Sequence, residues 1–281
     1  MGSDRRNQRC GKGVGVEQLI LAVEACDTAG EIICVPSSVN ELFELPFAGI
    51  LNRTIILTIF AAVIVGVVLF FGLRKRSLVP SKFEIVVESM VTFVRDEISV
   101  GIIGKEHGLK YFPYLLSLFM FLLVGNIFAV TPFVMFPVTS RIGIPIFLAL
   151  ITWVLFVFAG FKEQGFGYLK DLIWPPGVPV GIKPLVGIIE VVSVFLVRPF
   201  SLAVRLFANL VAGHVMLTLL LASGWVFISG AGGLGKVPIG FGWFTLGMGI
   251  YLFEILVAVL QAYIFTLLSA VYIQTSVQPE H

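Results

Sequence analysis

The feature that most constrains this chain is an uninterrupted apolar block that runs from Leu185 to Ile228. A helix of that length measures about 66 Å at 1.5 Å per residue, whereas the hydrocarbon core of a bilayer is about 30 Å thick. Nothing inside the block resembles a loop, because its one proline, Pro199, can sit in a membrane helix as a kink. Two interpretations stay open: two spans without a polar turn, or one long and steeply tilted helix.

Composition places the whole chain in the membrane. Of its 281 residues 58% are hydrophobic and only 13% are charged, whereas a soluble domain has about 45–50% and about 25%. The apolar residues also come in blocks of 20 or more, as in bilayer-spanning helices. We therefore predict an all-α polytopic membrane protein with about five membrane-crossing helices. The net charge of +2 indicates no nucleic-acid partner, and we expect no metal or cofactor.

The first span is predicted over residues 54–73, which carry no charge and end at Arg74-Lys75-Arg76. This cluster marks the cytoplasmic side by the positive-inside rule. Residues 1–53 are then an extracytoplasmic N-terminal segment, although basic residues near the start argue the other way. A cleaved signal peptide is not expected, because Glu17 and Glu24 interrupt the short apolar stretch there.

The middle of the chain divides into an interfacial helix and a hairpin. Apolar residues recur at helical spacing among charged ones over 81–103, which predicts an amphipathic helix on the cytoplasmic membrane face. Residues 112–130 and 142–161 are predicted to form a transmembrane hairpin.

The second half of the predicted membrane domain, 54–275, consists of two long helices. They cover 185–228 and 243–275, with the glycine-rich stretch 229–242 as the turn between them. Residues 276–281 form a cytoplasmic tail. The chain has no detectable internal repeat, unlike many secondary transporters.

Ionisable and polar side chains concentrate in these two helices. Such residues cost about 2.5–3.5 kcal/mol each on insertion scales, so each one is a functional hypothesis by default. Candidates for the site are Glu190, Arg205, Asn209, His214, Glu254 and Gln261.

Counting from the predicted turn places His214 level with Glu254 and Arg205 level with Gln261, while Glu190 lies near the cytoplasmic end. His and Glu can relay protons. An arginine stays protonated and attracts carboxylates, so it interrupts a proton path. This order predicts two offset half-channels separated by a fixed positive charge.

Two motifs resemble subunit a of F-type ATP synthases. One is RPFSLAVRLFANLVAGH at 198–214, and the other is LQAYIF at 260–265 on the last helix. The segmentation of residues 50–275 is similar to that family as well. The Val-Arg-Pro-Phe run and the Pro-Val-Thr-Ser segment at 137–140 are similar to actinobacterial members.

The resemblance implies a proton-translocating stator subunit, not an enzyme on its own, whose two long helices form a hairpin against the c-ring. Arg205 would face the c-ring carboxylate, Asn209, His214, Glu254 and Gln261 would line the outer half-channel, and Glu190 would lie on the exit side. Implied partners are the c-ring, subunit b of the peripheral stalk, the other synthase subunits and membrane lipid. The implied location is the bacterial plasma membrane, with the N-terminus outside and the C-terminus in the cytoplasm.

Several alternatives accompany these roles. Asn209 and Gln261 are also candidates for interhelical hydrogen bonding alone, Asn126 is expected to pack in this way rather than carry protons, and Arg198 is expected to be structural. Cys26 and Cys34 form a disulfide or stay free thiols. The alternative function is a stand-alone ion channel or secondary transporter; a membrane enzyme would need a nucleophile or metal motif, and the sequence holds none.

Overall fold

The computed structural model describes residues 53–74, 81–131, 142–174, 181–229 and 234–277, and all regular structure in them is helical. Within these residues five helical elements are long and apolar enough to cross a membrane, which confirms the prediction of an all-α polytopic membrane protein. The N-terminal segment with Cys26 and Cys34, the end of the basic cluster at Lys75 and Arg76, and most of the tail lie outside the described residues.

The apolar block that opens the second half of the chain is one continuous helical element. It comprises α7 (Lys183–Val192), a π-helical segment η2 (Ser193–Val197) and α8 (Arg198–Ile228). Together they extend over 46 residues, about 69 Å at the α-helical rise. Of the two interpretations of this block, the single long helix is the one found.

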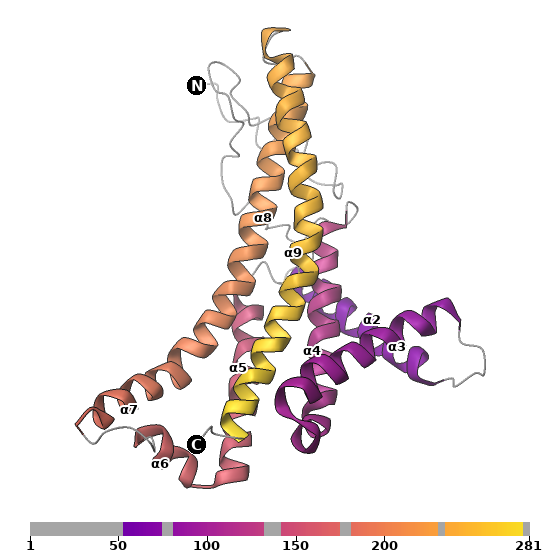
Figure 1. Cartoon of the computed structure of the whole chain (residues 1–281). Helices are drawn as coiled ribbons and strands as arrows, with labels where there is room; N and C mark the ends of the chain where they lie inside the picture. The colour runs from indigo at the N-terminus through magenta and orange to yellow at the C-terminus, as the bar shows by residue number, and fades with distance from the viewer. Residues whose placement is uncertain (1–52, 75–80, 132–141, 175–180, 230–233, 278–281) are drawn as a thin grey trace, which may run out of the picture.

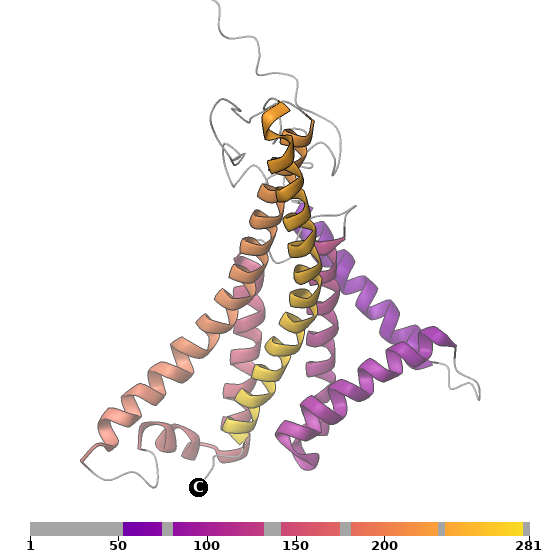
Figure 2. The same ribbon diagram turned by 45° about the horizontal axis from the view of Figure 1, so that its top comes forward.

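The helix α9 (Val237–Val277) returns antiparallel to α8. The two helices lie side by side near the turn, called here the tip, and separate toward the opposite end, the base (Figures 1 and 2). The base contains α6 (Gly167–Ile173), α7 and the C-terminal end of α9.

The turn prediction at 229–242 was wrong for its second half, because α9 begins at Val237. One glycine of this stretch, Gly240, allows close helix packing instead of a turn, as does Gly224 of α8. A Cβ on Gly240 would lie 2.8 Å from the backbone nitrogen of Ile228, and one on Gly224 would lie 2.8 Å from the backbone nitrogen of Phe244. Glycine lets the two backbones approach at the tip, as small residues do between membrane helices.

The remaining long helices are α2 (Arg53–Arg74), α4 (Lys105–Val130) and α5 (Gly143–Gln164). Two of them pack against the hairpin, namely α4 and α5, and α2 packs against α4. The helix α5 contacts both α8 and α9 and lies between their diverging lower halves (Figures 1 and 2). A partly buried hydrogen bond between Tyr114 Oη and Thr152 Oγ1, 2.6 Å long, joins α4 to α5.

Both helices of the predicted hairpin extend beyond their apolar parts. The helix α4 starts at Lys105 rather than at residue 112, and α5 continues to Gln164 rather than ending at 161. Hydropathy marks only the part that needs lipid, whereas the polar ends are held by an ion pair between Lys110 Nζ and Glu163 Oε1 at 2.7 Å. Gln164 Nε2 also donates to the Ser276 carbonyl of α9 at 3.0 Å.

The segment predicted to be interfacial folds as α3 (Lys82–Phe93) followed by a π-helical segment η1 (Val94–Ile103). Its start is fixed by a capping box, in which Ser81 and Glu84 each bond the other's backbone N–H. Its end is fixed by Gly104, whose φ of +92° suits glycine. Ser99 Oγ donates to the Gly108 carbonyl at 2.6 Å, which ties η1 to α4.

Candidate functional site

The face where α8 meets α9 holds two of the predicted proton carriers at one level. A Cβ added to Gly213 would lie 3.0 Å from Glu254 Oε1, so the carboxylate of α9 rests against the backbone beside His214. Glu254 is 8% exposed and His214 is 4% exposed. The register counted from the sequence therefore agrees with the structure to within about one residue here.

One turn further toward the base, Asn209 Nδ2 donates to Gln261 Oε1 at 2.7 Å across the hairpin. This bond corrects the expectation that Arg205 lies level with Gln261. Arg205 precedes Asn209 by four residues, so it lies about one turn closer to the base. The count failed here because it assumed that both helices advance equally from the turn, whereas between these two contacts α9 advances by seven residues and α8 by four.

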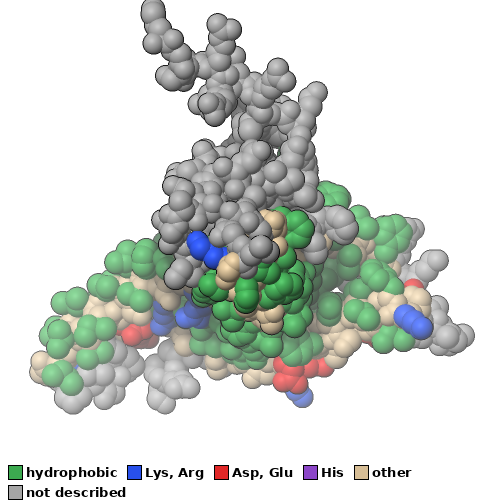
Figure 3. Space-filling model, turned by 90° about the horizontal axis from the view of Figure 1, so that it is seen from above, with side chains coloured by type: hydrophobic (Ala, Val, Ile, Leu, Met, Phe, Trp, Pro, Cys, Tyr) green, Lys and Arg blue, Asp and Glu red, His purple; other side chains and the backbone are tan. Residues whose placement is uncertain are grey.

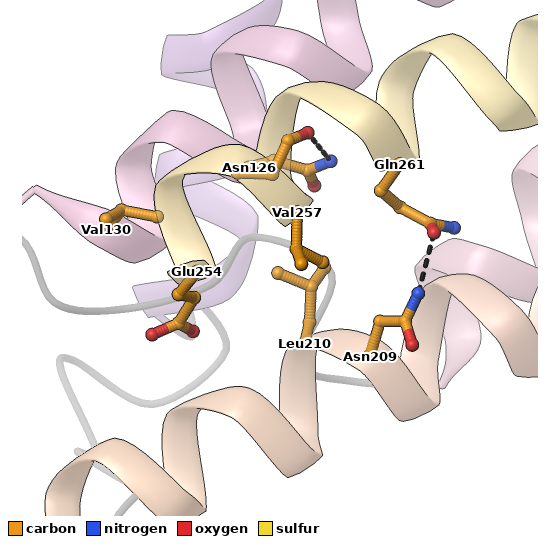
Figure 4. A pocket seen from close by; sticks show the side chains of 8 residues that line it. Asn126, Val130, Asn209, Leu210, Glu254, Val257 and Gln261 are labelled. Carbon is orange, nitrogen blue, oxygen red and sulfur yellow. Dashed lines mark hydrogen bonds between the residues drawn. The ribbon is translucent and has the colours of Figure 1, made fainter. Parts of the chain in front are cut away.

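A small cavity lies between these two levels, with room for about one water molecule. Its lining includes the site residues Asn209, Glu254 and Gln261 together with Asn126 of α4 (Figure 4). Asn126 Nδ2 donates to the Ala258 carbonyl at 3.1 Å. Within the described residues four buried side-chain polar atoms have no hydrogen-bond partner. Three of them belong to residues that line the cavity, namely Asn126 Oδ1, Glu254 Oε1 and Gln261 Nε2, whereas the fourth, Trp243 Nε1, lies outside the lining.

Sequence reasoning undervalued Asn126. As an isolated polar residue in an apolar span it indicated helix packing, and its bond to Ala258 does join α4 to α9. Its side-chain oxygen, however, is buried and unpaired within the described residues beside the cavity. Buried polar atoms are almost always hydrogen-bonded, so this oxygen indicates a place for water.

Arg205 differs from the other ionisable groups of the hairpin. Its side chain is half-buried, and among the residues that the structure describes no hydrogen bond or ion pair to its guanidinium is found. Arg205 shares one face of α8 with three exposed residues at helical spacing, Ala208, Asn209 and Ala212. Small residues beside an unpaired arginine leave room for another helix to approach closely and supply an anion.

A second polar group lies at the base. Arg198 Nη2 bonds Glu190 Oε1 at 3.2 Å, and Arg198 Nη1 donates to Thr275 Oγ1 at 3.2 Å. The guanidinium also lies 5.2 Å from the ring centroid of Tyr272. Arg198 thus joins the two long helices, in keeping with the structural role expected for it, and it holds the carboxylate of Glu190.

From tip to base, polar residues follow one another in a fixed order along the hairpin. Nearest the tip are two contacts between α8 and α9, Gly213 with Glu254 and then Asn209 with Gln261. Arg205 follows, and the ion pair of Glu190 with Arg198 lies nearest the base. Hydrophobic side chains cover most of the described surface seen from the tip, and charged ones are few and scattered (Figure 3). Across the described segments no three His, Cys, Asp or Glu side chains gather in a way that holds a metal ion.

These observations define a class: a multi-pass helical membrane protein in which polar residues, among them an arginine unpaired within the described residues, follow one another along a long two-helix hairpin. The model of the family described as "ATP synthase A chain" matches residues 55–274. The chain therefore belongs to the ATP synthase subunit a family.

Curated relatives named ATP synthase subunit a agree with this assignment. The protein from Frankia alni is 46% identical over 228 residues, covering 79% of this chain and 76% of its own length. The Nocardioides sp. protein is 38% identical, covering 86% and 87%. The one from Cereibacter sphaeroides is 34% identical over 273 residues, covering 95% and 98%.

Membership makes the chain a membrane component of the ATP synthase complex rather than an enzyme on its own. Two of these relatives, from Frankia and Nocardioides, are actinobacterial, in keeping with the resemblance seen in the sequence. The alternative of a stand-alone channel or secondary transporter finds no counterpart among these relatives.

Proposed function

We propose that this chain provides two offset half-channels that load and unload protons on a carboxylate of the c-ring, with Arg205 as the barrier between them. The observation that carries the proposal is the position of Arg205. Polar groups lie on both sides of it along the hairpin, and its guanidinium has no anion among the described residues. An arginine in the hydrocarbon region is costly without a partner, so a partner subunit is expected to supply the carboxylate.

The outer half-channel would run from the tip to the cavity. His214 and Glu254 would pass protons inward, and Asn209, Gln261 and Asn126 would hold the water that carries them onward. Histidine and carboxylate side chains exchange protons readily, whereas Na⁺ would need a cage of oxygen ligands. The proposed transported ion is therefore the proton.

The inner half-channel would leave from the base past Glu190. A proton bound to the c-ring carboxylate would travel through lipid for nearly a full turn before it reaches this side. Arg205 would favour the ionised carboxylate at the interface and prevent direct leakage between the two halves. Each proton that moves through 100 mV contributes about 2.3 kcal/mol, so several are needed per ATP.

The proposal also gives the chain an orientation and partners. The tip would face the outside of a bacterial plasma membrane and the base the cytoplasm, with the N-terminus outside and the C-terminus inside. The c-ring would lie against the stripe of Arg205, Ala208 and Ala212, and subunit b would contact helices remote from it. Exposed apolar side chains of α2, such as Phe60 and Phe70, would face subunit b or lipid.

The test is Arg205→Ala in the complete ATP synthase, measured in inverted membrane vesicles. Proton-driven ATP synthesis should be abolished while the amount of assembled complex stays unchanged. Arg95→Ala is the matched control, because Arg95 is exposed and, among the described residues, pairs only with Asp96, its neighbour in sequence, at 2.7 Å. Normal proton-driven synthesis in Arg205→Ala vesicles would overturn the proposal.

A further inference from the structure

The long helix changes its winding at a defined place between Glu190 and Arg205. In η2, Ser193–Val197, the backbone N–H of Arg198 bonds the carbonyl of Ser193, five residues earlier instead of four. A π-helical turn contains one residue more than an α-helical turn and recurs at functional sites. Where the winding returns to α at Arg198, a carbonyl is left without its usual donor.

Pro199 makes this shortage worse. Proline has no backbone N–H, and a donor at position 199 would serve the carbonyl of Val194 at π spacing or that of Phe195 at α spacing. The Val194 residue is 1% exposed, so bulk water does not reach it. A buried carbonyl of this kind needs a partner from elsewhere in the fold.

The partner comes from α5. Trp153 Nε1 donates to the Val194 carbonyl at 3.2 Å. The same indole packs edge-on against Phe195, with ring centroids 5.7 Å apart and planes at 67°. Trp153 therefore contacts two successive residues of η2, one through its N–H group and one through its ring.

The extra residue of η2 determines which groups align at the base. In a regular α-helix, residues eight apart lie about 80° apart around the axis, whereas residues seven apart lie within about 20°. Glu190 and Arg198 are eight apart, yet their side chains bond at 3.2 Å. One residue taken up by the π turn gives them the geometry of a seven-residue spacing, so the bond depends on η2.

We propose that Trp153 is a positioning residue for proton exit: its bond to the Val194 carbonyl holds η2 open, which aligns Glu190 with Arg198 and sets the rotation of α7 relative to Arg205. The inference rests on the proposed function, in which Glu190 lies on the exit side. If η2 converted to regular α-helix, α7 would rotate about the helix axis by about 100° relative to Arg205.

The experiment uses the complete synthase with two replacements at position 153. Trp153→Phe removes the N–H and part of the ring. Replacement of Trp153 by benzothienylalanine removes only the N–H, because sulfur takes its place, and so keeps the packing if the phenylalanine variant assembles poorly. Trp225→Phe is the matched control, since Trp225 lies exposed on α8.

Two readouts are taken on each variant, namely proton-driven ATP synthesis per assembled complex and a spin-label distance across η2. The labels go on exposed Ile188 of α7 and Met216 of α8, with the three native cysteines replaced by serine. Loss of the N–H should lower synthesis by about five-fold or more and move the label distance by several ångström, while Trp225→Phe changes neither. An unchanged distance in the benzothienylalanine variant, or a synthesis rate that falls only in proportion to complex content, would overturn the inference.

The two proposals fail separately. If Arg205→Ala still supports proton-driven synthesis, the proposed function is wrong whatever the label distance shows. If Arg205→Ala abolishes synthesis but the benzothienylalanine variant keeps the wild-type rate and distance, only the role of Trp153 is wrong.

Discussion

Gly213 offers a way to move the proposed proton carrier on α9 without changing any ionisable group. In Gly213→Ala the new Cβ would lie 3.0 Å from Glu254 Oε1 and 3.4 Å from its carboxyl carbon. Ordinary contacts of this kind begin near the upper of these two values, so the oxygen must move by about 0.4 Å. Glu254 is buried against α8, which leaves little room for it to swing aside.

The expected loss follows from that displacement. A misplacement of 1 Å in a reacting group can cost about 100-fold in rate. On a logarithmic scale a shift of about 0.4 Å then lowers the rate by about six-fold. Helix propensity acts in the opposite direction, because alanine is about 1 kcal/mol better than glycine inside a helix. Assembly should therefore be unharmed while proton transfer slows.

Gly249→Ala is the matched control. Gly249 also lies inside a helix of the hairpin, but a Cβ there meets nothing within 4 Å, so the change brings only the gain in helix propensity. The assay is proton-driven ATP synthesis in inverted vesicles, divided by the amount of assembled complex. Equal rates for Gly213→Ala and Gly249→Ala would refute the reasoning, because Glu254 would then not have to be held where it is.

Three further substitutions test the contacts around the site. Asn209→Leu removes the 2.7 Å hydrogen bond to Gln261 and should lower the stability of the hairpin by about 1 kcal/mol. Subunit a should then dissociate from the purified complex at a lower temperature, and an unchanged midpoint temperature would contradict the prediction. Gly224→Val should prevent assembly, because the new side chain would lie 2.8 Å or less from the backbone of Phe244, which cannot move aside. The measurement is an immunoblot of membranes for subunit a, and a wild-type amount of the subunit would contradict the prediction. Lys110→Met breaks an exposed pair with Glu163 and should cost at most about 1 kcal/mol, with the difference from wild type shrinking at high salt in the same thermal assay.

Much of the fold was predictable because bilayer thickness restricts the choices. Twenty apolar residues in a row allow few structures besides a helix, and the five long helices follow. The exceptions are positions whose residue type is compatible with two structures, a turn or loop and a helix. Gly240 and Gly242 looked like turn residues, but Gly240 closes the helix packing at the tip. Lys105 and Glu163 lie outside the hairpin helices predicted over 112–130 and 142–161, but the structure includes them in α4 and α5.

The candidate site, like the fold, could be predicted from the sequence only in part. The levels of His214 and Glu254 could be counted from the turn because each residue advances an α-helix by a fixed amount. The winding of η2 could not be counted, since a π turn depends on Trp153 in another helix rather than on local sequence. Asn126 was undervalued for a related reason, because its unpaired oxygen matters only beside groups that come from α8 and α9.

The contrast between the two arginines of α8 supports different roles for them. Arg198 has its charge satisfied by Glu190, Thr275 and the Tyr272 ring, which is what a structural residue near a membrane surface needs. Arg205, two turns deeper, has none of these contacts among the described residues. A protein gains nothing from carrying an unsatisfied arginine at that depth unless another subunit supplies the anion. In the proposed function the same positive charge would attract the carboxylate of the c-ring and repel protons, so one residue would both hold the rotor and prevent a leak.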